Sequence, residues 1–357
     1  MNNGRKVTVV LDSSHHSMRL ISVARNQETA EEGYQQWKYM YVNGILKYIK
    51  QFDADEFIVA VDSRKNWRKD VYPYYKAHRK LLRNKDDQKN EEHWFSFKEY
   101  FERYGDLLEE IKTNLPVKVV ETEYAEADDV AAVLSYSDEL KDNEVVFITT
   151  DGDYVQLLER PHRVLYSPIK KKIVHCDDPK AELLMKIFTG DKGDFVPSIA
   201  DKHTFKPEFL EYCVKTLDVA QSENNAKIKL LGSEKLLMES SISFQQEIGL
   251  KPSRVTGFSA KQAKGIINNN EVELFLSDPE NEELKKNFLR NNKLVNLKMQ
   301  PKELKVEIMD NYNDYGSLPN SSKLFKYFVK NKYNGLLDNL DDITSSLDSL
   351  YKQPVNA

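Results

Sequence analysis

The sequence near the N-terminus is Val7-Thr8-Val9-Val10-Leu11-Asp12, an apolar and β-branched run that ends in an acid. The same arrangement returns at Phe57-Ile58-Val59-Ala60-Val61-Asp62, and again at Val145-Val146-Phe147-Ile148, which leads into Thr149-Thr150-Asp151-Gly152-Asp153. A weaker candidate covers residues 116–120. Short continuous runs of this kind predict strands that are buried on both faces, as the strands of a parallel sheet are.

Helical patterns occupy the segments between these runs, over residues 31–51, 100–114 and 126–134. Strands that alternate with helices predict an α/β fold, in which a mostly parallel sheet is covered by helices on both faces. After about Gly190 the pattern becomes mainly helical.

Composition excludes several classes of protein. The 357 residues suit one large or two medium domains. No apolar run approaches the roughly 18 to 20 residues that span a bilayer, and Met1–Lys6 lacks the apolar stretch of a secretory signal. Only two cysteines are present, so we expect a reducing compartment, the cytoplasm, and no membrane partner.

The net charge of −5 argues at first against a nucleic-acid partner, but the charge is unevenly distributed. Between Arg64 and Lys85 there are nine Lys or Arg against one acid, Asp70, and tryptophan and tyrosines are interleaved with them. Cations hold phosphates and aromatic faces stack unpaired bases, so the segment fits a single-stranded nucleic acid. A solvated helix face whose aromatics pack in the core explains the pattern equally well.

Acids gather where the predicted strands end. A single Asp after a strand is more often a helix N-cap or a turn residue than a ligand. In a parallel sheet, however, all such ends meet at one edge, and so many carboxylates together would repel one another without a cation. Their hard oxygen atoms favour Mg²⁺ or Mn²⁺. The acids at these ends and at the start of the later region are Asp12, Asp62, Glu126, Asp128, Asp129, Asp151, Asp153, Asp191 and Asp194.

Five short motifs, in this order, resemble the flap endonuclease family of 5′ nucleases: 10–12, 61–64, 126–129, 150–153 and 190–194. Residues 67–79, 288–297 and 323–330 are similar to viral members of that family, so the likeness spans nearly the whole chain. The resemblance implies a PIN-like three-layer α/β/α nuclease domain over 1–195, with a basic arch at about 64–100. It also implies a helical DNA-binding region over 196–357.

The resemblance also implies the role of each acid. Asp12, Asp62, Glu126 and Asp128 match a first, tighter metal site. Asp151, Asp153, Asp191 and Asp194 match a second, and Asp129 lies nearby as a supporting residue. Two Mg²⁺ ions are implied, for which Mn²⁺ would substitute. His15 and His16 follow Asp12, but we interpret them as loop residues near the site, because two-metal hydrolysis needs no protein base.

Basic residues are assigned from the same resemblance. Lys76 and Arg79 match residues that reach the scissile phosphate, and we expect them to share one face of a helix. Residues 84–95 would lie in the arch and be mobile without DNA. The residues expected to contact nucleic acid are Arg64, Arg68, Tyr75, Lys76, Arg79, Lys80, Gly257, Lys261 and Lys264.

One departure from the family concerns the helix-hairpin-helix that usually follows the last acidic motif. Here Asp194 is followed by Phe195 and Val196, and the nearest hairpin candidate lies at about 254–268. We therefore expect an insertion at about 198–250. The candidate lacks the usual Gly-Ile-Gly, which puts a bound monovalent cation in doubt.

The implied activity is Mg²⁺-dependent 5′→3′ exonuclease and flap endonuclease cleavage, of the ribonuclease H type, that removes RNA primers and 5′ flaps during lagging-strand replication. The products would carry 5′-phosphate and 3′-hydroxyl ends. The expected partners are DNA and RNA–DNA duplexes with 5′ ends, flaps or forks, together with a single-stranded-DNA-binding protein or sliding clamp, and we expect a monomer.

Two rival functions fit the sequence less well. A non-catalytic, structure-specific DNA-binding protein on the same fold would be expected to lack several ligands. A haloacid-dehalogenase-like phosphatase needs an Asp-x-Asp pair after the first strand, which Asp12-Ser13-Ser14 does not provide.

Overall fold

The computed structural model describes residues 4–77, 79, 83, 93–200, 258–315, 321–347 and 350. Lys80, Gly257, residues 84–92 and most of the expected insertion lie outside this range, so the predictions for them stay predictions. Among the described residues, no helix combines the length and the apolar character needed to cross a membrane.

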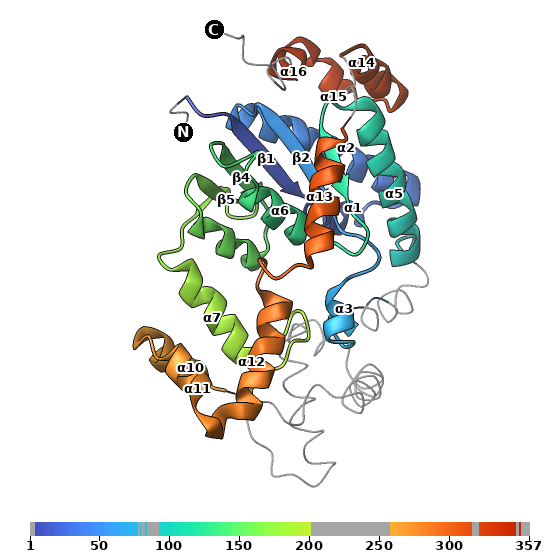
Figure 1. Cartoon of the computed structure of the whole chain (residues 1–357). Coiled ribbons are helices and arrows are strands. Elements are labelled where there is room, and N and C mark those ends of the chain that lie inside the picture. The colour runs from blue at the N-terminus through green and yellow to red at the C-terminus, as the bar shows by residue number, and fades with distance from the viewer. Residues whose placement is uncertain are drawn as a thin grey trace. The chain divides into compact units, whose positions relative to one another are not determined.

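The described residues form a six-stranded sheet with the order β3-β2-β1-β4-β5-β6. Figure 1 labels four of its strands, β1, β2, β4 and β5. Neighbouring strands pair in parallel except for β5 and β6, which are antiparallel. The strands are β1 Val7–Asp12, β2 Glu56–Val61, β3 Lys118–Glu121, β4 Glu144–Ile148, β5 Arg163–Ser167 and β6 Lys172–Val174. The four strands expected from the sequence are therefore present, and β5 and β6 are additions.

The chain divides into two compact units that are both discontinuous in sequence. Unit 1 consists of Met1–Asn66, Asp87–Asp177 and Gln300–Ala357, and unit 2 consists of Trp67–Asp86 and Asp178–Met299. The expected division into 1–195 and 196–357 separates the chain by expected role, whereas these two units are defined by packing. The expected division stays a prediction.

Helices cover both faces of the sheet in unit 1. Alternation along β1 sends Val9 and Leu11 into a core shared with α1, α2 and α5, whereas α6 packs against β1 and β2 and contacts α13. The helices are α1 Ser13–Ala24, α2 Ala30–Phe52, α5 Phe97–Asn114, α6 Ala127–Tyr136, the 3₁₀ helix η1 Gly152–Glu159, α13 Lys302–Asn313, α14 Ser321–Lys330, α15 Asn334–Leu337 and α16 Leu340–Leu347. The expected three-layer α/β/α fold is confirmed.

Burial places several aromatic residues of unit 1 in its core. Tyr327 and Phe328 in α14 are buried there. Phe95 is also buried, and Trp94 donates from Nε1 to the Gln27 carbonyl at 2.7 Å. The expectation that the arch extends to residue 95 is therefore wrong for Trp94 and Phe95, because these side chains pack in the core.

Unit 2 is built from short helices around a small aromatic core. Phe188 in α7 stacks on Phe258 and contacts Phe288 in α12 edge to face. Asn291, which is fully buried, donates to the carbonyls of Ile187 and Pro197. The helices are α3 Arg68–Val71, α7 Pro179–Thr189, α10 Ala260–Asn268, α11 Val272–Ser277, the 3₁₀ helix η2 Pro279–Asn281 and α12 Glu282–Val295. The expected helical C-terminal region is confirmed.

Candidate active site

The carboxyl ends of four parallel strands carry acids at one edge of the sheet. The order reverses between β1 and β4, where ligands of open α/β sheets bind. Burial, and after it the charges of Asp12, Asp128, Asp151 and Asp62, raise the pKa of Tyr154 well above its usual range. Four carboxylates from four chain segments therefore act on one buried hydroxyl group.

Asp12 occupies the centre of this edge, as the last residue of β1, and only 3% of it is exposed. Its Oδ1 accepts from the His15 amide at 3.1 Å, which caps α1, and its Oδ2 accepts from Thr149 Oγ1 at 2.8 Å. Burial is the main reason that its pKa is raised to about 6; the charges of Asp62 and Asp151 act in the same direction, and His15 opposes them. The expected helix-capping role and a role in the acidic site thus coexist in one side chain.

Asp62 is joined to Asp12 by a serine. Ser14 Oγ lies 2.5 Å from Asp62 Oδ2 and 3.3 Å from Asp12 Oδ1. The amide of Ala127, at the start of α6, donates to Asp62 Oδ1 at 2.7 Å. The two carboxylates are therefore held by groups from α1 and α6 at the same edge of the sheet.

The start of α6 supplies three more acids. Carboxylate oxygens of Glu126, Asp128 and Asp129 lie within 4.8 Å of one another. Asp129 is fully buried, and its Oδ2 accepts from the Glu126 amide at 3.0 Å as part of a capping box. Its geometry fits the supporting role, because one oxygen is used to hold the helix N-terminus.

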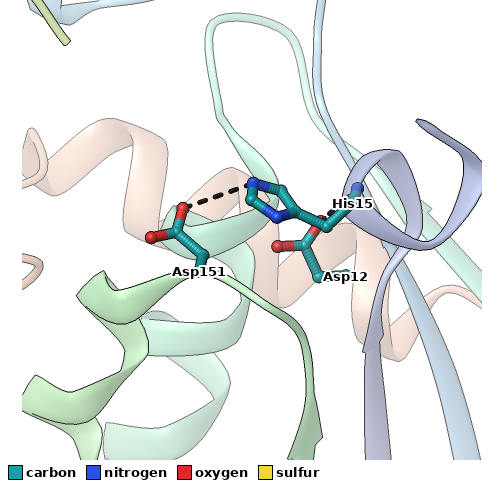
Figure 2. Close-up of side chains that lie close together, drawn as sticks. All are labelled: Asp12, His15 and Asp151. Atoms are coloured by element: carbon teal, nitrogen blue, oxygen red, sulfur yellow. Dashed lines mark hydrogen bonds and ion pairs between the residues drawn. The ribbon is translucent and has the colours of Figure 1, made fainter. Parts of the chain in front are cut away.

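Asp151 follows β4 and begins the 3₁₀ helix η1. Its Oδ1 accepts from the Asp153 amide at 2.9 Å, so the turn expected as the ordinary interpretation is present. Its Oδ2 lies 3.5 Å from His15 Nε2. Figure 2 shows the His15 ring directed at Asp151, with Asp12 beneath it. One ligand atom each of Asp12, His15 and Asp151 lie within 4.8 Å of one another.

The two histidines after Asp12 lie in helix α1, and the expectation that they are loop residues is wrong. His16 is buried between the rings of Tyr41 and Tyr48, and burial lowers its pKa to about 3. His15 instead faces the acids, with Nδ1 2.8 Å from Thr150 Oγ1.

Asp191 and Asp194 belong to unit 2, where cations hold them. Lys186 Nζ lies 2.8 Å from Asp191 Oδ2. Burial by itself raises the pKa of Asp191, but Lys186 and the amides of Asp194 and Gly193 outweigh it and lower that pKa. The ligand set expected for the second ion draws on both units, and its assembly stays a prediction.

Asp194 contacts both basic residues that were expected to bind the scissile phosphate. Arg79 Nη2 lies 2.6 Å from Asp194 Oδ1, and Lys76 Nζ lies 3.5 Å from Asp194 Oδ2. Lys76 has a φ of +54° and lies in a turn that the Arg79 amide closes by donating to its carbonyl. The expectation that both lie in one helix is wrong, because the left-handed backbone at Lys76 interrupts it.

Two residues expected to contact nucleic acid are buried instead. Arg68 is 1% exposed, and its Nε donates to the Leu294 carbonyl at 2.8 Å. Tyr75 is also 1% exposed and donates its hydroxyl to Asp194 at 2.9 Å. These predictions are corrected, because neither side chain is available to a phosphate or a base. Arg64 is exposed at the surface.

The hairpin candidate contains one well-capped helix. The Ser259 side chain accepts from the Gln262 amide and Gln262 reaches back to the Ser259 amide, so α10 begins with a capping box. Lys261 and Lys264 are exposed on this helix, whereas Ala263 is buried. The structure thus leaves both lysines accessible, and their contact with duplex stays a prediction.

Sequence reasoning missed the residues that hold the acids in place. Ser14 and Thr149 are hydrogen-bonded to Asp12, and Thr150 to His15. Tyr154 is buried, and its hydroxyl has no hydrogen-bond partner among the described residues. A Ser or Thr beside an acid is common, so no sequence pattern distinguishes these positions.

This donor set fits a divalent cation. The raised pKa of Asp12 reflects burial and the repulsion of Asp62 and Asp151, and a bound cation would offset both. Carboxylate oxygens are ligands for hard ions such as Mg²⁺ and Mn²⁺.

Comparison with known proteins defines the class. A family model described as the 5′-3′ exonuclease, N-terminal resolvase-like domain, matches residues 7–196, more than half of the chain. The chain belongs to this family, whose members are metal-dependent phosphodiester hydrolases. The resemblance drawn from the acidic motifs is confirmed.

Particular relatives extend the match beyond that domain. The chain is 26% identical over 313 residues to the ribonuclease H of Enterobacteria phage T4, covering 85% of this chain and 86% of that protein. It is 26% identical over 208 residues to a 5′-3′ exonuclease of Buchnera aphidicola, covering 55% and 66%. A solved structure of T5 5′-exonuclease with divalent metal ions (zinc) has a TM-score of 0.54 at 16% identity, covering 97% of this chain and all of that one, and it shows the same fold.

Proposed function

We propose that this chain is a Mg²⁺-dependent, two-metal 5′→3′ exonuclease and flap endonuclease that removes RNA primers and 5′ flaps from DNA during lagging-strand replication. Its substrates are DNA and RNA–DNA duplexes with 5′ ends, flaps or forks. The T4 relative bears the name ribonuclease H, and a T5 neighbour of the same fold, with a TM-score of 0.50, is described in complex with DNA.

The convergence of acids at one edge of the sheet is the main support for this proposal. Acids from four separate chain segments converge at the carboxyl edge of the sheet, where their charges act together on Asp12 and Tyr154. A structural protein gains nothing from this arrangement, because mutual repulsion of buried carboxylates destabilises the native state.

The chain's own residues would divide the work as follows. Asp12, Asp62, Glu126 and Asp128 hold the first ion, and Asp151 and Asp153 contribute to the second together with Asp191 and Asp194. When bound, two such ions lower the pKa of a water and stabilise the leaving oxygen. Ser14, Thr149 and the Ala127 amide keep Asp12 and Asp62 oriented.

Lys76 and Arg79 would hold the scissile phosphate. An Arg fork donates two hydrogen bonds to a phosphate and a Lys adds a point charge. In the structure both are bound to Asp194. A phosphate at this position would compete with Asp194 for the two cations, so substrate binding would release that carboxylate.

Asp62→Asn and Asp128→Asn test the proposal against a non-catalytic DNA-binding protein on the same fold. We expect a 5′-labelled flap substrate to be cleaved in Mg²⁺ and left intact in EDTA. Both variants should lose cleavage yet retain DNA binding, since basic groups supply most of the affinity. The exposed Asp106→Asn serves as the matched control.

Turnover near the wild-type rate in Asp62→Asn or Asp128→Asn would overturn the metal assignment. Tight flap binding by the wild type with no cleavage in Mg²⁺ or Mn²⁺ would instead favour the non-catalytic alternative. Binding to a single-stranded-DNA-binding protein or a sliding clamp belongs to the same proposal, as does action as a monomer in the cytoplasm.

A further inference from the structure

His15 is the residue of the acidic edge that the proposed function leaves unused. Its side chain is 39% exposed and that of Asp151 31%, so solvent reaches both. Its ring lies over Asp12 and is directed at Asp151 (Figure 2). The backbone amide of His15 donates to Oδ1 of Asp12, the N-cap residue of helix α1. This hydrogen bond fixes the position of the His15 backbone, from which the ring extends.

The distance between His15 and Asp151 fits two ligands of one ion better than it fits an ion pair. A charged hydrogen bond between imidazole and carboxylate places its atoms about 2.7–2.9 Å apart. His15 Nε2 and Asp151 Oδ2 are separated by 3.5 Å. Two ligands bound to one ion at about 2.0–2.2 Å lie roughly 3–3.5 Å from each other.

The opposite ring nitrogen has the partner that a ligating histidine needs. Nδ1 lies 2.8 Å from Thr150 Oγ1. Ligating imidazoles commonly donate their second N–H to an oxygen, which fixes the tautomer and the ring orientation. In the tautomer that donates from Nδ1 to Thr150, the lone pair of Nε2 is directed toward Asp151.

We propose that His15 Nε2 is a nitrogen ligand that shares one divalent cation with Asp12 and Asp151, so that this edge favours Mn²⁺ and similar transition ions over Mg²⁺. The inference rests on the proposed function, because it adds a ligand at the same acidic edge, where Asp12, assigned above to the first ion, would also bind the ion that Asp151 holds. Imidazole binds transition ions well, whereas Mg²⁺ prefers oxygen ligands and keeps its waters. A separate observation comes from Tyr154, whose buried hydroxyl has no hydrogen-bond partner among the described residues. The charges of Asp12 and Asp151 act on this hydroxyl group. An unpartnered polar group beside these acids indicates a site that takes a polar ligand.

The test is pulsed electron paramagnetic resonance of the full chain with one equivalent of Mn²⁺. Nitrogen bound to Mn²⁺ modulates the electron spin echo, and carboxylate oxygens do not. We expect ¹⁴N modulation in the wild type, and none in His15→Gln. His162→Asn is the matched control, since His162 is exposed in a turn before β5.

Affinity supplies a second measurement. Free-Mn²⁺ signals, titrated with and without competing Mg²⁺, should show that His15→Gln weakens Mn²⁺ binding about tenfold or more. Mg²⁺ binding should change little. His15→Asp should keep Mn²⁺ bound without ¹⁴N modulation, because it replaces the nitrogen with oxygen.

A wild-type echo without ¹⁴N modulation, or modulation that persists in His15→Gln, would overturn the inference. The proposed function is separable from it. If the flap is cleaved and Asp62→Asn is inactive while no nitrogen is detected, the nuclease proposal stands and the His15 ligand fails. If nitrogen is detected but no flap is cleaved with either ion, the metal ligand stands and the nuclease proposal fails.

Discussion

Replacing Asp12 with Asn should stabilise the metal-free protein at pH 7, although Asp12 is buried and hydrogen-bonded. Substitutions of buried polar residues normally destabilise. Here the carboxylate carries a penalty, because burial, Asp62 and Asp151 all disfavour its charged form. An Asn side chain can keep the hydrogen bonds, accepting from the His15 amide and donating to Thr149 Oγ1.

The magnitude follows from the pKa of Asp12, which is raised from 3.8 to about 6. Each pKa unit corresponds to about 1.4 kcal/mol, so the ionised carboxylate costs the native state roughly 3 kcal/mol at pH 7. Because the native pKa is the higher one, this cost is absent below pH 3.8, where the carboxyl group is protonated in both states, and stability is lost as the pH rises through about 6. Asn removes both the penalty and its pH dependence.

Urea unfolding in EDTA, followed by circular dichroism between pH 4.5 and 8, measures both effects. We expect the free energy of unfolding of Asp12→Asn to exceed that of the wild type by up to about 3 kcal/mol at pH 7. The two curves should converge toward pH 4.5. Asp106→Asn, exposed on α5, is the control and should track the wild type.

Equal or lower stability of Asp12→Asn at pH 7 would refute the reasoning, because it would show that the carboxylate is not strained by its surroundings. Adding a divalent cation should reverse the order of the two proteins. The cation neutralises the wild-type acids, whereas Asn offers it no charge.

Three further predictions concern other parts of the molecule. Lys76→Ala and Arg79→Ala should each slow single-turnover cleavage at saturating enzyme by roughly 10² or more, and an unaltered rate in both would confine them to positioning DNA. Lys261→Ala with Lys264→Ala should weaken duplex binding and reduce its salt slope by up to about two; an unchanged slope would move the duplex contact elsewhere. Tyr154→Phe should raise thermal stability in EDTA by about 1 kcal/mol, because it removes a buried hydroxyl that has no partner among the described residues, and a loss of stability would show that the hydroxyl has one.

The strands that decide the fold were predictable because they are short, continuous and buried on both faces. β1 and β4 consist almost entirely of fully buried residues, and their runs of Val, Leu, Phe and Ile need no alternation to be recognised. The acids at their ends were equally visible, since Asp12 ends its run and Asp151 follows Ile148 after two threonines.

Helix α1 could not be predicted from periodicity because several of its buried residues are polar. Trp37 Nε1 donates to Ser17 Oγ at 3.2 Å, and Ser17 is also hydrogen-bonded to Tyr100. The Ser13 hydroxyl is hydrogen-bonded to the hydroxyl of Tyr41, with an oxygen–oxygen distance of 2.5 Å, and to the hydroxyl of Tyr104. These partners come from α2 and α5, so the burial of Ser13 and Ser17 depends on tertiary contacts that the local sequence does not contain.

Strand β5 was missed for a similar reason. Its first residue, Arg163, is buried, and its guanidinium donates to the carbonyls of Ser135, Leu140 and Asn143. A charged residue at a buried strand end weakens an apolar pattern. The contact of His15 with Thr150 joins residues 135 positions apart, so the sequence could not predict it. The packing of α13 against β3 could not be predicted for the same reason.

The return of the chain after Gln300 to unit 1 has a consequence for synthesis. Leu324, Phe328 and Leu336 belong to the same core as Val9 and Leu11 of the first strand. A ribosome delivers the strands and their acids well before it delivers these side chains. The core that supports the acidic edge therefore stays incomplete until residues beyond 336 have emerged, and contacts of such long sequence separation are slow to form. A nascent chain that already carries every acid of the proposed site would thus acquire a fully supported metal centre only after the residues around Leu336 have been synthesised.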